Sequence, residues 1–305
     1  MKQHPSRRDF LKVSAACMSP LASLAPAAAG VAAGPPPERK GLPIKKAVLI
    51  SMLPKTLSYA DRFKLARDVG FEAVEAQTIE DQGVAEEIKK AAEDAKIRIH
   101  SVMNMGHWKY PLSSGDPSVV EKCMDGMKTS LHNAALWGAD TVLLVPGVVN
   151  PETGYQAAWT RSQSQINKLL PLAAELKVVI AVEEVWNKFL LSPLEMTAFV
   201  TAFQSEWVKV YFDVGNVVLY GYPQDWIRTI GRITAKVHIK DFKVDREAGK
   251  WEWKNLGDGE IDWAEVRKAF AEVNYAGYAS TELPGGDEAY LRDVSQRFDR
   301  FVLGL

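Results

Sequence analysis

Four residues with metal-binding side chains lie at the carboxyl ends of four short apolar runs. The runs are Val178–Glu183, Val208–Asp213, Ala235–His238 and Tyr278–Glu282. If these runs are parallel strands of a barrel, their carboxyl ends meet at one mouth. Three carboxylates and one imidazole gathered there would form a site for a hard or borderline divalent cation.

A charged side chain at the end of a buried strand is costly unless it is paired or bound to a metal. A single glutamate in that position is commonly a helix cap or an ion-pair partner. Side chains alternate along a strand, so Glu183 shares a face with Ala181, and His238 shares one with Lys236 and Lys240. Four such residues on four consecutive strands favour one shared metal site.

The elements that must position these residues alternate along the chain. We predict strands near Ala47–Met52, Ala73–Glu75, Arg98–Met103, Thr141–Val145, Val178–Glu183, Val208–Phe212, Ala235–Ile239 and Tyr278–Thr281. Amphipathic helices are predicted near Tyr59–Val69, Ala85–Ala95, Val119–Leu136, Thr160–Leu176, Pro193–Phe203 and Ile261–Val273. Alternating strands and helices imply parallel crossovers. Eight such units predict an α/β fold, a closed (β/α)8 TIM barrel.

An open doubly wound sheet is the alternative architecture. It would require a glycine-rich phosphate-binding turn after the first strand. The chain continues instead with Leu53-Pro54-Lys55-Thr56, so the barrel is favoured.

The first residues have the features of an export signal. Ser6-Arg7-Arg8-Asp9-Phe10-Leu11-Lys12 matches a twin-arginine motif, and Ala27-Ala28-Ala29 fits a cleavage site. We therefore expect a signal peptide over residues 1–33, a linker over 34–44 and a catalytic barrel over 45–305. The expected location is the periplasm, with no membrane anchor once the signal is cleaved.

The composition limits the kinds of molecule that this protein is expected to bind. The 305-residue chain has a net charge of −1 and 47% hydrophobic residues, with no basic patch that would suit a nucleic acid. No apolar run after the signal is long enough to span a membrane. Cys123 is the one cysteine left after cleavage, which excludes an intrachain disulfide. A small molecule is the expected partner, and a homo-oligomer is left open.

Five stretches together give the chain a family resemblance. They are Val182–Leu190, Phe212–Asn216, Val237–Phe242, Leu256–Trp263 and Ser280–Glu282. In this order and spacing the chain resembles the xylose isomerase-like barrels, a superfamily of sugar isomerases and epimerases. The resemblance covers the C-terminal half closely and the N-terminal half through strand spacing.

The resemblance implies a cofactor and a mechanism. Members that epimerise ketoses bind one divalent ion, often manganese, through two glutamates, an aspartate and a histidine. The matching residues are Glu183, Asp213, His238 and Glu282, with manganese expected and magnesium, cobalt or zinc as alternatives. In those relatives the two glutamates also exchange the substrate proton, which makes Glu183 and Glu282 the expected catalytic residues. The Glu-Pro-x-Asn-Arg segment of ketohexose epimerases is absent here, which argues against a free ketohexose as substrate.

Several other residues are candidates for contacts around this site. Substrate contacts are predicted for Asn216, Lys240, His107, Trp108, Trp186 and Glu75. Lys240 has a solvated loop lysine as its alternative interpretation, and Glu75 an ion-pair partner. Asp241 is expected to orient His238 or Lys240, Glu184 to support the ligands or face the helices, and His100 to be a core histidine.

The leading functional hypothesis is a metal-dependent isomerase or epimerase that moves a proton next to the carbonyl of an unphosphorylated sugar or sugar derivative. No arginine cluster or glycine-rich cradle indicates a phosphate. A lyase that eliminates from 3-keto-glycosides is the alternative. An abasic-site endonuclease would require more histidines and a basic face. A non-catalytic sugar-binding barrel would lack one of the two glutamates.

The export signal gives the first testable prediction. Replacing Arg7 and Arg8 together with lysine should keep the precursor inside the cell, because the paired arginines are the element that the transporter recognises. Cell fractionation followed by immunoblotting measures this. A doubly substituted chain that still reaches the periplasm would contradict the targeting hypothesis.

Overall fold

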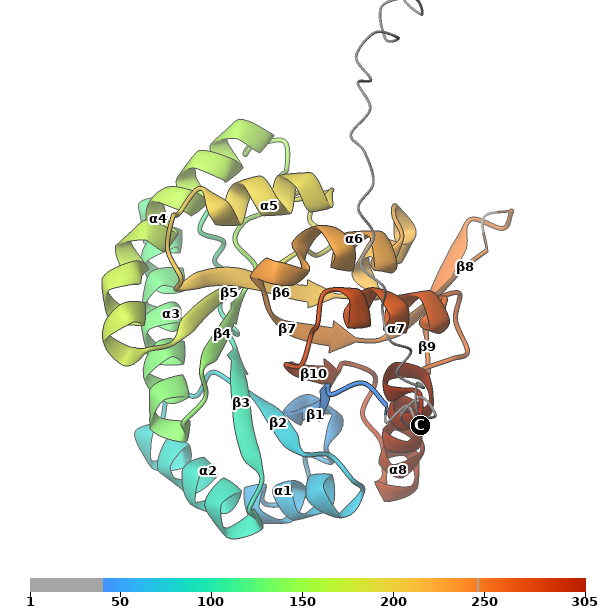
Figure 1. Cartoon of the computed structure of the whole chain (residues 1–305). Coiled ribbons are helices and arrows are strands. Elements are labelled where there is room, and N and C mark those ends of the chain that lie inside the picture. Colours follow the sequence, from blue (N-terminus) through green and yellow to red (C-terminus); the bar gives the residue numbers. More distant parts are fainter. Residues whose placement is uncertain (1–40, 246) are drawn as a thin grey trace, which may run out of the picture. The chain divides into compact units, whose positions relative to one another are not determined.

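The computed structural model describes residues 41–245 and 247–305, so the predicted signal and most of the predicted linker lie outside the described residues. Eight parallel strands close into a barrel in the order β1-β10-β7-β6-β5-β4-β3-β2 (Figure 1). The barrel strands are β1 (Lys45–Leu49), β2 (Ala73–Gln77), β3 (Arg98–Met103), β4 (Thr141–Leu144), β5 (Val179–Glu183), β6 (Val208–Asp213), β7 (Thr234–Ile239) and β10 (Tyr278–Thr281). The predicted TIM barrel is confirmed.

Helices form the outer layer (Figure 1). They are α1 (Tyr59–Asp68), α2 (Gln82–Ala95), α3 (Pro117–Trp137), α4 (Tyr155–Leu176), α5 (Pro193–Thr201), α6 (Pro223–Ile230), α7 (Trp263–Glu272) and α8 (Glu288–Arg297). Short helical turns are η1 (Ile50–Met52), η2 (Asn216–Leu219), η3 (Gly231–Ile233) and η4 (Phe298–Leu303). Side-chain caps fix several helix starts: Ser58 accepts from the backbone N–H of Asp61, and Ser192 accepts from that of Glu195. Within the described residues no helix combines the length and apolarity needed to cross a membrane.

Alternation along each strand divides the core into two regions. Outward-facing residues such as Ile180, Val182 and Phe212 pack under the helices in the larger apolar cluster. Inward-facing Ala181 and Tyr211 belong to a smaller cluster inside the barrel. Residues two positions further along the same inner faces are Glu183 and Asp213, so the strand period directs both carboxylates into the barrel mouth.

The structure corrects several predicted boundaries. β1 ends at Leu49 because Ile50–Met52 forms the turn η1, although the apolar run continues. The barrel domain begins before residue 45, since the backbone N–H of Leu42 donates to Leu303 O at 2.9 Å and Ile44 is buried. Helices α6 and α8 are additional to the predicted set.

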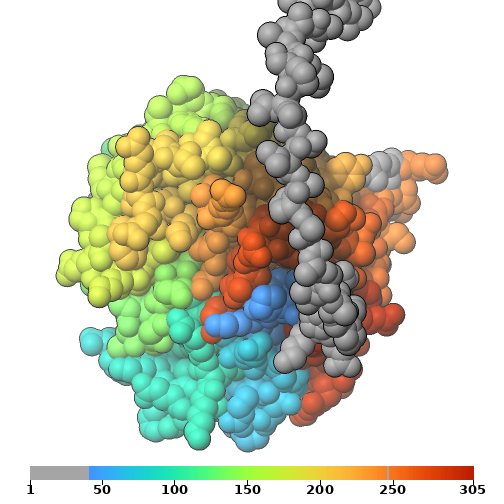
Figure 2. All heavy atoms as spheres, viewed as in Figure 1, coloured from blue at the N-terminus to red at the C-terminus, as the bar shows by residue number. Residues whose placement is uncertain are grey.

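An antiparallel hairpin that the sequence analysis did not predict follows β7. It consists of β8 (Asp241–Asp245) and β9 (Lys250–Lys254). Figures 1 and 2 show it projecting from the body of the barrel domain. It lies outside the barrel sheet, so it is free to form part of the barrel mouth.

Asp241 fastens the base of this hairpin. Its carboxylate accepts hydrogen bonds from the backbone N–H groups of Phe242 (2.9 Å) and Gly257 (2.8 Å) and from the indole N–H of Trp263 (3.0 Å). The expectation that Asp241 orients His238 or Lys240 is therefore wrong. Its partners lie in the hairpin and in the loop before α7, because Gly257 and Trp263 return to the base of β8.

Gly259 in that loop provides a test of this fastening. A Cβ at Gly259 would overlap the Asp241 carboxylate and lie 2.7 Å from Phe242 N. We expect Gly259→Ala to lower the free energy of unfolding by about 1–3 kcal/mol, the usual cost of overpacking. Urea denaturation measures it.

The control is Gly115→Ala, where the added Cβ meets only ordinary contacts with the Arg161 guanidinium at 3.4 Å or more. Its effect should stay within about 0.5 kcal/mol. Equal losses in the two variants would contradict the role given to the loop.

Candidate metal centre

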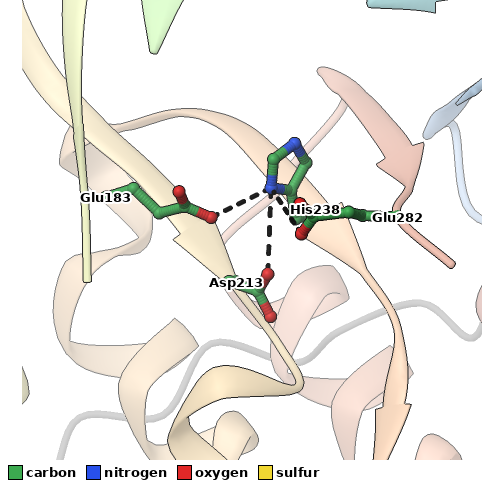
Figure 3. A group of neighbouring side chains, drawn as sticks. All are labelled: Glu183, Asp213, His238 and Glu282. Atoms are coloured by element: carbon green, nitrogen blue, oxygen red, sulfur yellow. Dashed lines mark hydrogen bonds and ion pairs between the residues drawn. The ribbon is translucent and has the colours of Figure 1, made fainter. Parts of the chain in front are cut away.

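The four predicted ligands converge at the carboxyl-terminal mouth of the barrel. Glu183 ends β5, Asp213 ends β6, His238 lies in β7 and Glu282 follows β10. One ligand atom from each lies within 4.8 Å of the other three. Figure 3 shows Glu183 reaching toward His238 Nδ1 from the left, Glu282 from the right and Asp213 from below.

The Nδ1 atom of His238 is at the centre of this group. It is 2.9 Å from Glu183 Oε1, 3.3 Å from Glu282 Oε2 and 3.8 Å from Asp213 Oδ2. Lys240 supplies the second cationic group, because its Nζ lies 2.7 Å from Asp213 Oδ2 and 2.6 Å from Glu282 Oε2. The imidazole and the ammonium are buried, as are Glu183 and Asp213, whereas the side chain of Glu282 is partly exposed.

The site contains more acidic groups than these two cationic groups can balance. Burial raises the pKa of Glu183 to about 7, and the neighbouring carboxylates add to that shift. Burial also raises the pKa of Asp213 and, strongly, that of Glu184. Burial acts in the same direction on Glu282, but the ammonium of Lys240 and His238 outweigh it and lower its pKa to about 2. Raised pKa values of these buried acidic groups indicate that too little positive charge lies near them to stabilise their ionised forms.

A divalent cation fits this arrangement. Bonds of about 2.0–2.6 Å from one ion place its ligand atoms within about 5 Å of each other, and the four donor atoms meet that limit. Oxygen donors with one imidazole suit manganese, magnesium, cobalt or zinc. Such an ion would supply the missing positive charge and lower the pKa values of the carboxylates around it.

Glu75 supports His238 from within the barrel. Its Oε2 lies 2.8 Å from His238 Nε2 and accepts a 2.7 Å hydrogen bond from the Tyr211 hydroxyl. The nearby carboxylates, Glu75 foremost, overcome the effect of burial and raise the pKa of His238. We predicted a sugar contact for Glu75, but its side chain is fully buried beneath the ring. Its position is instead that of the carboxylate behind a metal-binding histidine.

The polar network continues into the barrel interior. The hydroxyl groups of Ser101 and Ser280 lie 3.2 and 3.4 Å from that of Tyr211. His100 Nε2 lies 2.8 Å from Ser280 Oγ, and burial lowers the pKa of His100 well below its ordinary value. His100 is a buried core histidine, as expected.

Glu184 and Asn216 hold Asp213 in place. Glu184 Oε1 accepts a 2.8 Å hydrogen bond from the backbone N–H of Asp213. Asp213 Oδ1 in turn accepts from the backbone N–H groups of Gly215 and Asn216, at 2.8 and 2.9 Å. The Asn216 amide donates to the backbone oxygen of Glu184 at 2.8 Å. Glu184 thus holds the predicted metal ligand Asp213 in place, which is one of the two roles expected for Glu184.

A pocket with a volume of about 200 Å³ opens above the centre. It is lined by Met103, His107, Trp108, Glu183, Val185, Trp186, Asn216, Lys240, Trp253 and Glu282. Pockets for drug-sized ligands are roughly 300–1,000 Å³, so this one suits a smaller molecule. The structure therefore brings five of the six predicted substrate contacts to the pocket and separates Glu75 from it.

His107 and Trp108 form one wall of the pocket. His107 Nδ1 accepts from the backbone N–H of Val145 at 3.3 Å, and burial lowers the pKa of His107 to about 3. The ring is neutral at pH 7 and packs edge-on against Trp108, with centroids 5.3 Å apart. The Trp108 side chain is exposed, leaving an indole surface free at the mouth.

Trp186 and Trp253 also line the pocket. Their rings are stacked with centroids 5.0 Å apart. Trp186 Nε1 donates to Asn216 O at 2.9 Å, and Lys240 Nζ lies 4.8 Å from the centre of the Trp253 ring. Sequence reasoning missed Trp253, although the alternation of tryptophan with charged residues over Lys250–Lys254 is a strand signal that could have found it.

Eight parallel strands with acidic and imidazole side chains at one mouth define a barrel with a candidate divalent-metal centre. The chain belongs to the family of xylose isomerase-like TIM barrels, which it matches over residues 63–300.

Two curated relatives show how similar this chain is in sequence to known proteins. SgbU of Escherichia coli (strain K12), whose name gives L-ribulose-5-phosphate 3-epimerase as a provisional assignment, is 27% identical over 239 residues. That alignment covers 74% of this chain and 83% of the relative. The L-ribulose-5-phosphate 3-epimerase UlaE of Salmonella paratyphi C (strain RKS4594) is 23% identical over 245 residues, which cover 76% of this chain and 83% of the relative.

Solved structures share the fold. A D-psicose 3-epimerase crystallised with D-fructose has a TM-score of 0.69 at 20% identity, covering 86% of this chain and all of that one (100%). The 3-keto-D-glucoside 4-epimerase YcjR from E. coli has a TM-score of 0.68 at 14% identity, covering 82% of this chain and 97% of that one. At these identities the similarity shows the fold.

The role of Glu75 can be tested through metal affinity. Glu75→Gln removes the negative charge behind His238 but keeps the shape of the side chain. Loss of such a supporting carboxylate typically weakens metal binding about 10–100-fold, so we expect a weakening of about 10-fold in calorimetric titration with Mn²⁺. Glu80→Gln, on the exposed surface before α2, should bind Mn²⁺ like the parent protein. Equal affinities in all three proteins would contradict the role of Glu75.

Proposed function

We propose that this protein is a divalent-metal-dependent sugar epimerase that inverts a carbon next to a carbonyl group through an enediolate. The observation that supports this most directly is that Glu183 and Glu282 reach one centre from β5 and β10, the strands on either side of β6 and β7 (Figure 3). Inversion requires a proton to leave one face of a planar intermediate and return to the other face. Two carboxylates that reach the centre from different strands would meet that requirement.

The ligand set would be Glu183, Asp213, His238 and Glu282, and the ion held there would polarise the carbonyl and stabilise negative charge as it develops. Glu183 and Glu282 would each exchange one proton with the carbon that is inverted. Asp213 and His238 would remain fixed, because Glu184 and Glu75 hold them by hydrogen bonds. Manganese is the proposed ion, with magnesium, cobalt and zinc as alternatives.

Burial makes Glu183 the stronger base of the two, since Lys240 and His238 lower the pKa of Glu282. A carboxylate in water has a pKa near 4, too low to remove a carbon-bound proton efficiently at neutral pH. The pKa of Glu183 is raised by burial.

We propose an unphosphorylated sugar or sugar derivative as the substrate. Among the described residues that line the pocket, Lys240 is the one lysine or arginine, and it is already paired with Asp213 and Glu282. A phosphate would need free donors, commonly arginine or a helix N-terminus. The relatives SgbU and UlaE are named for a 5-phosphate substrate, so this chain would differ from them in that group. The proposed periplasmic location agrees with an unphosphorylated substrate, because sugar phosphates are cytoplasmic.

The named relatives are epimerases, and they give no support to the lyase alternative. A lyase needs one base, whereas this centre has two. A non-catalytic binding barrel would have no need of two carboxylates that converge on the same centre.

Glutamine variants in heavy water test the proposal. The manganese-loaded protein is incubated with a panel of unphosphorylated ketoses, aldoses and 3-keto-glycosides, and deuterium incorporation and epimer formation are followed by NMR and mass spectrometry. We expect Glu183→Gln and Glu282→Gln each to lower epimerisation about 10²–10⁴-fold, the usual contribution of a general base. One variant should retain deuterium exchange, because a single base can still remove and return a proton on one face.

Glu121→Gln, on the exposed side of α3, is the matched control and should keep full activity. Metal content is measured in each variant, so that loss of the ion is distinguished from loss of the base. Near-normal turnover in both site variants with the metal bound would contradict the proposal, and so would an elimination product in place of an epimer.

A further inference from the structure

The β8–β9 hairpin has an apolar face and a charged face. Cross-strand pairs place Phe242 opposite Trp253 and Val244 opposite Trp251, while Lys243 faces Glu252 on the other side. The apolar face packs against Trp186 and the charged face does not. The hairpin therefore presents its aromatic side chains to the barrel mouth.

These side chains form a continuous series of rings that leads out of the pocket. Trp253 lies over Lys240 and is stacked on Trp186. Trp251 packs edge-on against the same Trp186 ring, with centroids 5.1 Å apart and an interplanar angle of 78°. Exposure rises along the series, from 8% for Lys240 through 37% for Trp253 to 55% for Trp251.

Trp251 has two ring contacts although it is exposed. It contacts both Trp186 and Phe242, whose ring centroids are 5.1 and 6.3 Å away. A rigid aromatic surface loses little conformational entropy when a ligand binds to it. Trp108 is 56% exposed and also lines the pocket, whereas Trp251 lies outside it and contacts the pocket-lining Trp186.

We propose that these tryptophans form a second sugar subsite, so that the natural substrate is a sugar that carries a second ring, namely a disaccharide or another glycoside. The reacting ring occupies the pocket over the metal centre. The pocket volume of about 200 Å³ leaves a second ring outside, against Trp251. The apolar C–H face of a sugar ring packs against an indole by dispersion and removal of apolar surface from water. This inference rests on the proposed epimerase function and specifies its substrate class.

The continuity of Trp251 with the pocket through Trp186 and Trp253 favours a ligand that also enters the pocket. A second copy of the chain on the same surface would block the mouth. A glycoside and a second copy of the chain, as occupants of the Trp251 surface, predict different results for sugar binding and for the mass of the protein in solution.

The test compares D-fructose with two disaccharides that contain the same ketose and one additional ring. These are lactulose, which is linked through O4, and isomaltulose, which is linked through O6. Affinity for the manganese-loaded protein is measured by calorimetry and by quenching of tryptophan fluorescence, and deuterium exchange is recorded for each sugar. We expect at least one disaccharide to bind about 10-fold more tightly than D-fructose, as stacking on one aromatic ring allows.

Trp251→Ala should remove that advantage and leave the affinity for D-fructose unchanged. Tyr222→Ala, another exposed aromatic residue that does not line the pocket, should leave both affinities unchanged. Circular dichroism confirms that each variant is folded.

Three outcomes overturn the inference. They are equal affinity of D-fructose and both disaccharides, equal loss of all three sugars in Trp251→Ala, and a change from dimer to monomer in Trp251→Ala with sugar binding intact. Deuterium exchange with D-fructose alongside any of these results would leave the epimerase proposal standing. Absence of exchange with every sugar would contradict the epimerase proposal, while the affinity comparison would still decide whether the subsite exists.

Discussion

The structure depends on the burial of several carboxylates around one imidazole. A buried carboxylate is tolerated when it is neutral, paired or bound to a metal. Here Lys240 pairs with two acids and His238 with two others, and burial raises the pKa of Glu183 despite its contact with His238. A divalent cation would complete it, and the proposed catalysis uses the same charge.

The surrounding fold serves to hold this charged group in position. Strand alternation directs Glu183 and Asp213 inward, while Glu75 fixes the His238 ring from below. The hairpin after β7 adds Trp253 to the wall and extends it outward to Trp251. The barrel thus supplies the centre, and an addition outside the barrel sheet shapes its mouth, an arrangement that lets one fold act on different sugars.

Much of the fold and of the centre could be predicted because the signals are local. Short apolar runs that end in Glu183 and Asp213 predict both the strand and its last residue, and the run that ends in His238 predicts a strand that extends one residue further. The role of Glu75 could not be predicted, because its contact with His238 crosses the barrel interior and depends on closure of the sheet. The partners of Asp241 were missed for a similar reason, since Gly257, 16 residues later in the chain, returns to it. The hairpin was missed because Trp251 and Trp253 lie between charged residues and resemble a surface loop.

We infer that one divalent ion binds between the side chains of Glu183, Asp213, His238 and Glu282. Anomalous diffraction from a crystal soaked in Mn²⁺, recorded near the manganese absorption edge, tests it most directly. The account predicts one strong peak within about 2.0–2.6 Å of Glu183, Asp213, His238 Nδ1 and Glu282, with the Lys240 ammonium moved from its position between Asp213 and Glu282. An absent peak, or a peak elsewhere with Lys240 still in place, would contradict the account.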